Sequence, residues 1–252
     1  MPKEANYPIR SVENSLDIIQ VLQESNGARI RDLERELDMS KSAIHNHLST
    51  LRANEYVNKE GETYRLGLKF LDHGGYVRDN LKLYTAGKSE VDRLAEETGA
   101  SASLLTEEYG KGVTLYNSSG ENAVNLPIRT GRRIHLHNIG LGKAVLAHLP
   151  ESRIWEIIER HGLPKTTENT ITTPEELFEE VKRIREQGYS LDIEEREMGL
   201  QCIAAPIRQE EKVVGAISAS FPAGKIDNGF NEETKEAVQR ASNQVGLEIK
   251  YS

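Results

Sequence analysis

The 252-residue chain has a single cysteine, Cys202, and few aromatic residues, which make up 6% of it. One cysteine excludes an intrachain disulfide and agrees with a reducing compartment. No run of about 20 apolar residues is present, so the sequence predicts no membrane span. Residues 1–14 lack the apolar core of a signal peptide, so we expect a cytoplasmic protein.

A strongly basic character is also missing. The chain holds 32 Lys and Arg against 40 Asp and Glu, a net charge of −8, and acidic residues exceed basic ones both in residues 1–66 and in the remainder. Binding to nucleic acid therefore depends on where single charges lie, not on the overall field of the protein. We expect any such binding to weaken steeply with salt.

Residues 28–66 depart from this acidic background. Apolar residues recur at spacings of three and four within 30–37 and again within 44–51, which predicts two amphipathic helices. Asp38 and Met39 form the turn between them, and Ser40 is suited to cap the second helix. No acidic residue occurs from Ser40 to Asn54. A short hairpin follows, with the turn at Glu60-Gly61-Glu62. Residues 1–66 are thus expected to form a winged helix-turn-helix, which fits the DNA major groove.

The candidate DNA contacts are the polar residues on the open face of the second helix and two basic residues of the wing. Asn46 is suited to read adenine, while Lys41 and His45 reach base edges or phosphates. A small helical subdomain with a solvated polar face is the alternative, and the acid-free stretch with its wing favours DNA. The full set is Ser40, Lys41, Ser42, His45, Asn46, Ser49, Arg52, Lys59 and Arg65.

The rest of the chain alternates helical and strand-like segments. A first helix is expected at 11–25, with Val12, Leu16 and Ile19 as its apolar stripe, widened by Ile18 and Leu22. Residues 67–86 are interpreted as a linker helix with a bend at Gly74-Gly75. In 87–252 we expect an α+β sensor domain. Its helices are predicted at 89–98, 141–149, 151–161, 174–187 and 231–249, and its strands within 101–119, 189–193, 200–207 and 213–221.

Several longer motifs resemble the IclR family of transcriptional regulators, in the family order. They are SVENSLDIIQVLQ at 11–23, YRLGLKFLDHG at 64–74, HNIGLGKAVLAHLP at 137–150, GYSLDIEEREMGLQCIAAPI at 188–207 and VVGAISASFP at 213–222. The resemblance implies a winged-helix domain, a linker helix and a GAF-like effector domain. It also implies homodimers through the N-terminal parts, and often dimers of dimers.

The resemblance further implies an effector pocket lined by Gly140, Leu141, Asp192, Cys202, Ser218 and Ser220. The residues agree in part, because Ser218 and Ser220 lie two apart on a strand and so share one face. Leu141 departs from the small residue of members that sense pyruvate-like or glyoxylate-like acids. We therefore expect a pocket in the family position with a different lining.

Other interpretations of these residues stay open. The two serines would also fill a tight sheet, and Cys202 would serve as a small buried hydrophobe. His135 and His137 have ligand-like spacing on a strand, so a metal site that includes His135, His137 or Cys202 is an alternative. No metal or other cofactor is predicted. Residues 129–133 are expected to form a surface loop. Alternation places Asp192 and Glu194 on one side of an extended segment.

The sequence thus predicts a sequence-specific regulator, a repressor by preference, controlled by an organic acid or an intermediate of sugar or aromatic catabolism. Its expected partners are double-stranded DNA with a pseudo-palindromic operator, a small-molecule effector and a second copy of the chain. One alternative is a DNA-binding protein whose C-terminal domain only oligomerises. The other is a GAF-like enzyme using Cys202, which lacks a second thiol and any phosphate-loop or Gly-x-Ser-x-Gly motif.

Overall fold

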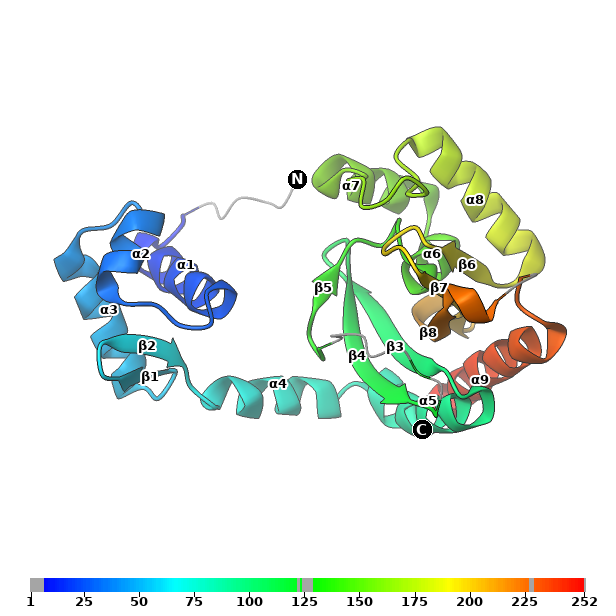
Figure 1. Ribbon diagram of the computed structural model, residues 1–252, viewed down its shortest axis with the longest axis horizontal. Coiled ribbons are helices and arrows are strands. Elements are labelled where there is room, and N and C mark those ends of the chain that lie inside the picture. The colour runs from blue at the N-terminus through cyan, green and yellow to red at the C-terminus, as the bar shows by residue number, and fades with distance from the viewer. Residues whose placement is uncertain (1–6, 122, 124–128, 227–228, 252) are drawn as a thin grey trace. The chain divides into compact units, whose positions relative to one another are not determined.

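The computed structural model describes residues 7–121, 123, 129–226 and 229–251. The chain divides into two compact units, Pro2–Val77 and Arg78–Ser252, shown in Figure 1. The predicted linker, 67–86, spans the point of division. Among the described residues, no helix has the length and apolar character needed to cross a membrane.

The N-terminal unit consists of three helices and a two-stranded wing. They are α1 (Arg10–Glu24), α2 (Ile30–Glu36), α3 (Lys41–Ala53), β1 (Val57–Glu60) and β2 (Thr63–Leu66). The hairpin turns tightly because Gly61 adopts φ +59°, which favours glycine. The predicted helix pair and wing are confirmed. The apolar stripes of α2 and α3, including Leu33, Ile44 and Leu48, join one small core.

The predicted stripe of α1 is wrong in part. Val12 and Leu16 are 53% and 59% exposed, whereas Ile18 and Leu22 are at most 1% exposed and face the core. Two apolar stripes compete on this helix, and the sequence does not show which one the other helices cover. Tertiary packing selects the Ile18 stripe and leaves the other open to solvent.

The expected bend at Gly74-Gly75 does not occur. Helix α4 (Lys69–Asp79) runs through both glycines, and helical geometry is lost at Asn80 and Leu81 instead. Glycine in a helix costs only about 1 kcal/mol relative to alanine, which neighbouring residues can offset. Helix α5 (Lys82–Thr98) then begins seven residues before its predicted start, because Leu83, Tyr84 and Ala86 bury their side chains in the core of the C-terminal unit.

The C-terminal unit is built on an antiparallel six-stranded sheet with the order β5-β4-β3-β8-β7-β6. Helices α5 and α9 pack on one face, and α6, with α7 and α8 beyond it, covers part of the other (Figure 1). The remaining bounds are β3 (Ser101–Glu108), β4 (Lys111–Ser119), β5 (Arg133–Ile134), α6 (Gly140–Leu146), α7 (Glu151–His161), α8 (Pro174–Gln187), β6 (Ser190–Ile193), β7 (Leu200–Gln209), β8 (Lys212–Pro222), the 3₁₀ turn η1 (Ala223–Lys225) and α9 (Glu232–Tyr251).

Strand β8 shows how the sheet separates its two faces. Ile217, Ala219 and Phe221 belong to the core beneath α5 and α9. The alternate residues include Ser218 and Ser220, which therefore lie together on the other face, as the spacing predicts. One face of the sheet thus carries the main apolar core, and the other carries a buried polar region.

Two local expectations fail at strand ends. Strand β5 is only Arg133–Ile134, so His135 and His137 follow the strand and do not lie on it. Strand β6 ends at Ile193, and Glu194 adopts φ +58°. The Glu194 N–H donates to the Leu200 carbonyl at 3.0 Å, and this turn removes Glu194 from the side of Asp192.

Candidate functional site

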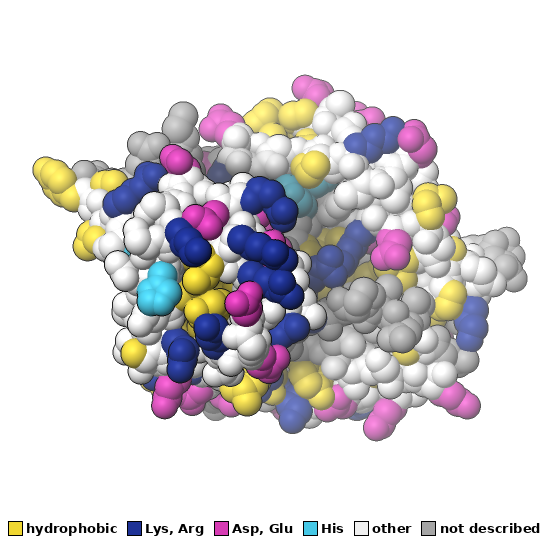
Figure 2. Space-filling view, turned by 60° about the vertical axis from the view of Figure 1, so that its left-hand side comes forward, with side chains coloured by type: hydrophobic (Ala, Val, Ile, Leu, Met, Phe, Trp, Pro, Cys, Tyr) yellow, Lys and Arg dark blue, Asp and Glu magenta, His cyan; other side chains and the backbone are white. Residues whose placement is uncertain are grey.

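The open face of α3 carries seven of the predicted DNA contacts. Its orientation is fixed by Ile44 and Leu48, both 0% exposed. The Ser40 hydroxyl accepts the Ala43 N–H at 3.3 Å and caps the helix. The exposed residues of this face, here called the α3 face, are Ser40, Lys41, Ser42, His45, Asn46, Ser49 and Arg52. Figure 2 shows Lys and Arg side chains gathered on the N-terminal unit.

The two basic residues of the wing differ from each other. Lys59 is exposed, with its ammonium 5.4 Å from the centre of the Tyr64 ring. Arg65 is half-buried, lies 3.4 Å from a Glu60 carboxylate oxygen and donates to the Asn26 carbonyl. Arg65 therefore helps to hold the wing against the turn after α1, while Lys59 faces solvent.

The predicted effector residues come together in one small cavity of the C-terminal unit, here called the α6 cavity. Its volume is about 40 Å³. Gly140 and Leu141 enter it from the first turn of α6, and Asp192 enters from β6. The complete lining is Ser103, Thr114, Arg132, Ile134, Ile139, Gly140, Leu141, Asp192, Arg196, Leu200, Cys202, Ser218 and Ser220.

Strand register explains why these distant residues meet. Asp192 lies opposite Cys202, and Cys202 lies opposite Ser220, so the three form a row across β6, β7 and β8. Ser103 on β3 is opposite Ser218. Helix α6 approaches this row closely, since a Cβ on Gly140 would lie 3.3 Å from the Cys202 sulfur.

Positive charge exceeds negative charge around the α6 cavity. Asp192 is 2% exposed, and burial raises the pKa of its carboxyl to about 6, although it accepts the Glu195 N–H at 2.9 Å. Burial lowers the pKa of the Arg196 guanidinium, and the nearby charge of Arg132 lowers it further. Two guanidinium groups beside one carboxyl favour an anionic guest.

Two further polar groups complete the lining. The Ser218 hydroxyl is fully buried and has no hydrogen-bond partner among the described residues, so it can donate to a guest. Burial, and then the charge of Asp192, raise the pKa of the Cys202 thiol to about 12. The thiol is therefore protonated at neutral pH, and it lacks the thiolate that nucleophilic chemistry needs.

Sequence reasoning missed Arg196, Ser103 and Thr114, and for Arg132 it favoured a surface loop over contact with a ligand or DNA. Arg132 is exposed yet lines the α6 cavity. Arg196 lies four residues after Asp192, directly behind the Asp-x-Glu-Glu stretch, and this proximity was the available signal. Ser103 and Thr114 gave none, because isolated Ser and Thr residues on strands are common.

The structure does not bring the histidines together with Cys202. The His135 and His137 rings are 5.6 Å apart, but the Cys202 thiol lines the α6 cavity elsewhere. His137 Nε2 lies 3.1 Å from the Pro164 carbonyl, and His161 Nε2 lies 2.8 Å from the Tyr109 carbonyl. Within the described part of the chain, no group of three His, Cys, Asp or Glu residues is placed to hold a metal ion.

A winged helix joined to a domain with a buried polar cavity defines a ligand-responsive class of DNA-binding protein. The helix-turn-helix model of the IclR family matches residues 11–61, and the model described as "Bacterial transcriptional regulator IclR C-terminal" matches residues 76–247. The chain belongs to the IclR family of transcriptional regulators.

Individual relatives match along nearly the whole chain. The probable HTH-type transcriptional regulator ArcR of Halobacterium salinarum is 36% identical over 248 residues, covering 96% of this chain and 94% of that protein. The transcriptional repressor IclR of Escherichia coli is 26% identical over 249 residues, covering 96% and 91%. The solved IclR homolog of Microbacterium hydrocarbonoxydans, complexed with 4-hydroxybenzoate, superposes with a TM-score of 0.81 at 22% identity, covering 96% and 98%.

Proposed function

We propose that the protein is a repressor whose affinity for its operator is lowered by a small organic acid in the α6 cavity. The observation that carries the proposal is the pairing of Arg132 and Arg196 beside one carboxyl, Asp192, with the Ser218 hydroxyl left without a partner. The solved homolog named above holds an aromatic acid, and the E. coli relative is a repressor. Both agree with this assignment.

The volume of the α6 cavity limits the size of the ligand that it can hold. About 40 Å³ holds only a few water-sized groups. We therefore favour an acid of few non-hydrogen atoms. Pyruvate is a probe of this size, although Leu141 makes the lining differ from that of members that sense pyruvate-like acids. A benzoate-sized acid requires the Leu141 side chain, which is 8% exposed, to move aside.

On DNA, the proposal assigns base contacts to the α3 face and phosphate contacts to Lys59. Two winged units then read the half-sites of a pseudo-palindrome. The proposed dimer is supported by apolar side chains that are exposed in the single chain: Val12 and Leu16 on α1, and Leu71 and Tyr76 on α4, 53–72% exposed. A regulator acts where the chromosome is, so the proposal includes the expected cytoplasmic location.

The test is fluorescence-anisotropy binding to DNA from upstream of the protein's own gene, with unrelated DNA of equal length for comparison. At constant ionic strength, pyruvate should weaken binding to the specific DNA. Arg196→Ala should bind that DNA normally but no longer respond to the acid. Arg208→Ala, which removes an exposed arginine at the end of β7, should behave as wild type.

Other outcomes point to the alternatives. If no small acid changes DNA affinity or stabilises the folded protein, the C-terminal unit serves in oligomerisation alone. Mass measurement in solution then shows whether the assembly is a dimer or a dimer of dimers. Turnover of an acid by the purified protein would restore the enzyme interpretation, against which the protonated Cys202 argues.

A further inference from the structure

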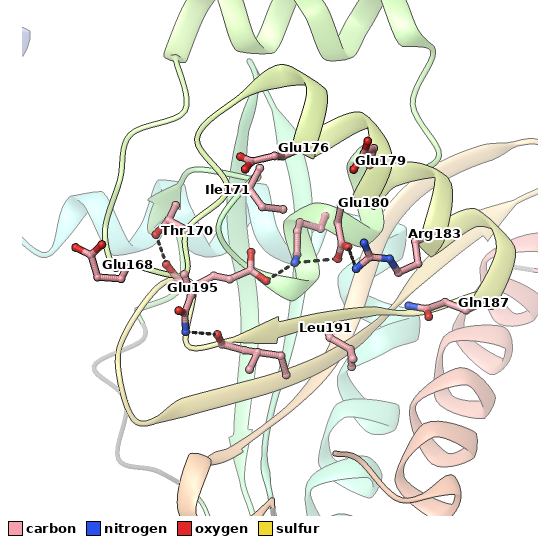
Figure 3. A pocket seen from close by; sticks show the side chains of 13 residues that line it. Glu168, Thr170, Ile171, Glu176, Glu179, Glu180, Arg183, Gln187, Leu191 and Glu195 are labelled. Carbon is pink, nitrogen blue, oxygen red and sulfur yellow. Dashed lines mark hydrogen bonds and ion pairs between the residues drawn. The ribbon is translucent and has the colours of Figure 1, made fainter. Parts of the chain in front are cut away.

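A second and larger cavity lies beside residues 192–196, which form the end of β6 and the turn after it. Its volume is about 440 Å³. Asp192 and Arg196 line the α6 cavity, whereas Ile193 and Glu195 line this one, so a single turn separates the two. Helix α8 forms another wall (Figure 3). We call this space the α8 cavity.

The α8 cavity is strongly acidic. Five glutamates line it: Glu168, Glu176, Glu179, Glu180 and Glu195. Two cations of the lining oppose them, and both are engaged with Glu180, while Lys165, outside the lining, pairs with Glu168 at 2.7 Å. Lys143 Nζ, on a side chain 1% exposed, donates to Glu180 Oε1 at 3.0 Å and to Glu195 Oε1. Arg183 donates to Glu180 Oε2 at 2.9 Å. Negative charge remains in excess, because Glu176 and Glu179 are exposed on the same helix.

One carboxylate oxygen of this cavity lacks a donor. The Glu195 side chain is 10% exposed, and its Oε2 has no hydrogen-bond partner among the described residues. In Figure 3 the Glu195 side chain extends toward the part of the cavity where Ile171 and Glu180 lie. Burial raises the pKa of this carboxyl to about 7 even though Lys143 lowers it. A buried acceptor without a partner calls for a donor that the protein itself does not supply.

We infer that the α8 cavity binds an organic cation that carries ammonium groups, a diamine or triamine. One ammonium group would donate to Glu195 Oε2, and another would lie between Glu176 and Glu179. Ile171, Leu191 and Ile193 line the space between and suit an alkyl stem. A bare metal ion fits poorly, because the volume suits a small organic molecule and the described residues offer no set of three ligands.

The inference is separate from the proposed function. The two cavities have opposite charge, and the cation is bound by residues that do not line the α6 cavity. Binding is measured on the protein alone, without DNA or acid. A failed operator assay therefore leaves this inference intact, and a failed amine titration leaves the operator intact.

The experiment is isothermal titration of the full-length protein with spermidine and putrescine at constant ionic strength. We expect saturable binding of one molecule per chain, and no heat from 1,4-butanediol, which keeps the length without the charge. Magnesium chloride at equal ionic strength should not displace spermidine. Equal competition by magnesium, or binding of the diol, would overturn the inference.

Substitutions locate the site. Glu195→Gln should weaken spermidine binding about tenfold or more, because a charged acceptor is lost. If that variant fails to fold, the double variant Glu176→Gln, Glu179→Gln decides, since both side chains are exposed and should also weaken binding. Glu186→Gln, an exposed residue of α8 outside the cavity, should bind as wild type. Unchanged affinity in the double variant would remove the α8 cavity as the site.

Discussion

The two units of this regulator differ in where their functional polar residues lie: on the surface in one unit and buried in the other. In the N-terminal unit a small apolar core, including Ile44 and Leu48, holds the α3 face outward into solvent. In the C-terminal unit the polar row of Asp192, Cys202 and Ser220 is buried between the sheet and α6. A surface site tolerates changes in backbone position, whereas an enclosed site depends on close approach of its walls. Substitutions in the N-terminal unit should therefore mainly reduce DNA affinity, and substitutions in the C-terminal unit should mainly change stability.

The largest effect is expected beside the enclosed site, where the first turn of α6 packs against the backbone of Leu136. A Cβ on Gly142 would lie 2.2 Å from the Leu136 carbonyl oxygen. Gly142→Ala should therefore lower the free energy of unfolding of the C-terminal unit by about 3 kcal/mol or more. Urea denaturation followed by fluorescence of Trp155, the one tryptophan, measures it. Gly224→Ala, with no atom within 4 Å of the added carbon, is the control; equal stability of both variants would contradict the expectation.

The second effect depends on pH. Because burial raises the pKa of Asp192 to about 6, the folded chain holds this proton more tightly than the unfolded chain does. The stabilisation is complete below about pH 4 and is lost as pH rises through about 6. Asp192→Asn removes this dependence, so at pH 8 the variant should be more stable than wild type, by up to about 3 kcal/mol.

Urea denaturation at pH 4 and pH 8, again followed by Trp155 fluorescence, tests this. The two proteins should differ least at pH 4. Asp17→Asn, which changes an exposed carboxyl of α1, should follow wild type at both values. A variant less stable than wild type at pH 8 would show that Asp192 works as a paired carboxylate in the folded protein.

On the surface site, substitution should cost DNA affinity and leave stability unchanged. Asn46→Ala is expected to weaken specific binding by about 1–3 kcal/mol and to relax discrimination at one base pair. Lys41→Ala should weaken all DNA binding and reduce the salt dependence by about one counterion. Anisotropy across a salt series separates the two effects. Lys182→Ala, on the exposed side of α8, should change neither quantity.

The smallest effect concerns Ser40, which belongs to both the surface site and the local fold. Ser40→Ala removes the cap of α3 and should cost about 1 kcal/mol of stability. Ser40→Asp keeps a capping oxygen but adds negative charge next to the phosphates, so it should retain stability and lose affinity. Circular dichroism and anisotropy on the same two variants measure these outcomes. Unchanged affinity in Ser40→Asp would contradict the expected position of Ser40 next to the phosphates.

The sequence predicts most of the fold, because helices and strands of this length follow local periodicity. The bounds of α7 and α8 are as predicted, and β7 and β8 extend their predicted strands by only one or two residues. The failures occur where tertiary packing chooses between equal local options. The two apolar stripes of α1 are equivalent in sequence, so the sequence does not show which one is buried. The start of α5 depends on whether Leu83 packs into the core of the C-terminal unit.

The two candidate sites also differ in how far the sequence predicts them. Residues of the α3 face lie on one helix, so their spacing in the sequence is their spacing in the molecule. The α6 cavity draws residues from all six strands of the sheet and from α6. Strand register, which the sequence does not display, decides which of these residues meet. The family resemblance supplied six members of the cavity, and only the structure adds Arg196 and the separate α8 cavity.

The alternation of strand β8 limits how such a sensor can evolve. Insertion or deletion of one residue before Ser218 would turn both serines into the core beneath α5 and α9 and bring Ile217 into the α6 cavity. We therefore expect the length of this strand to vary less among relatives than its cavity-facing side chains do. New ligand preferences should arise among relatives by replacement at positions 218 and 220, while changes in chain length collect in the connecting loops.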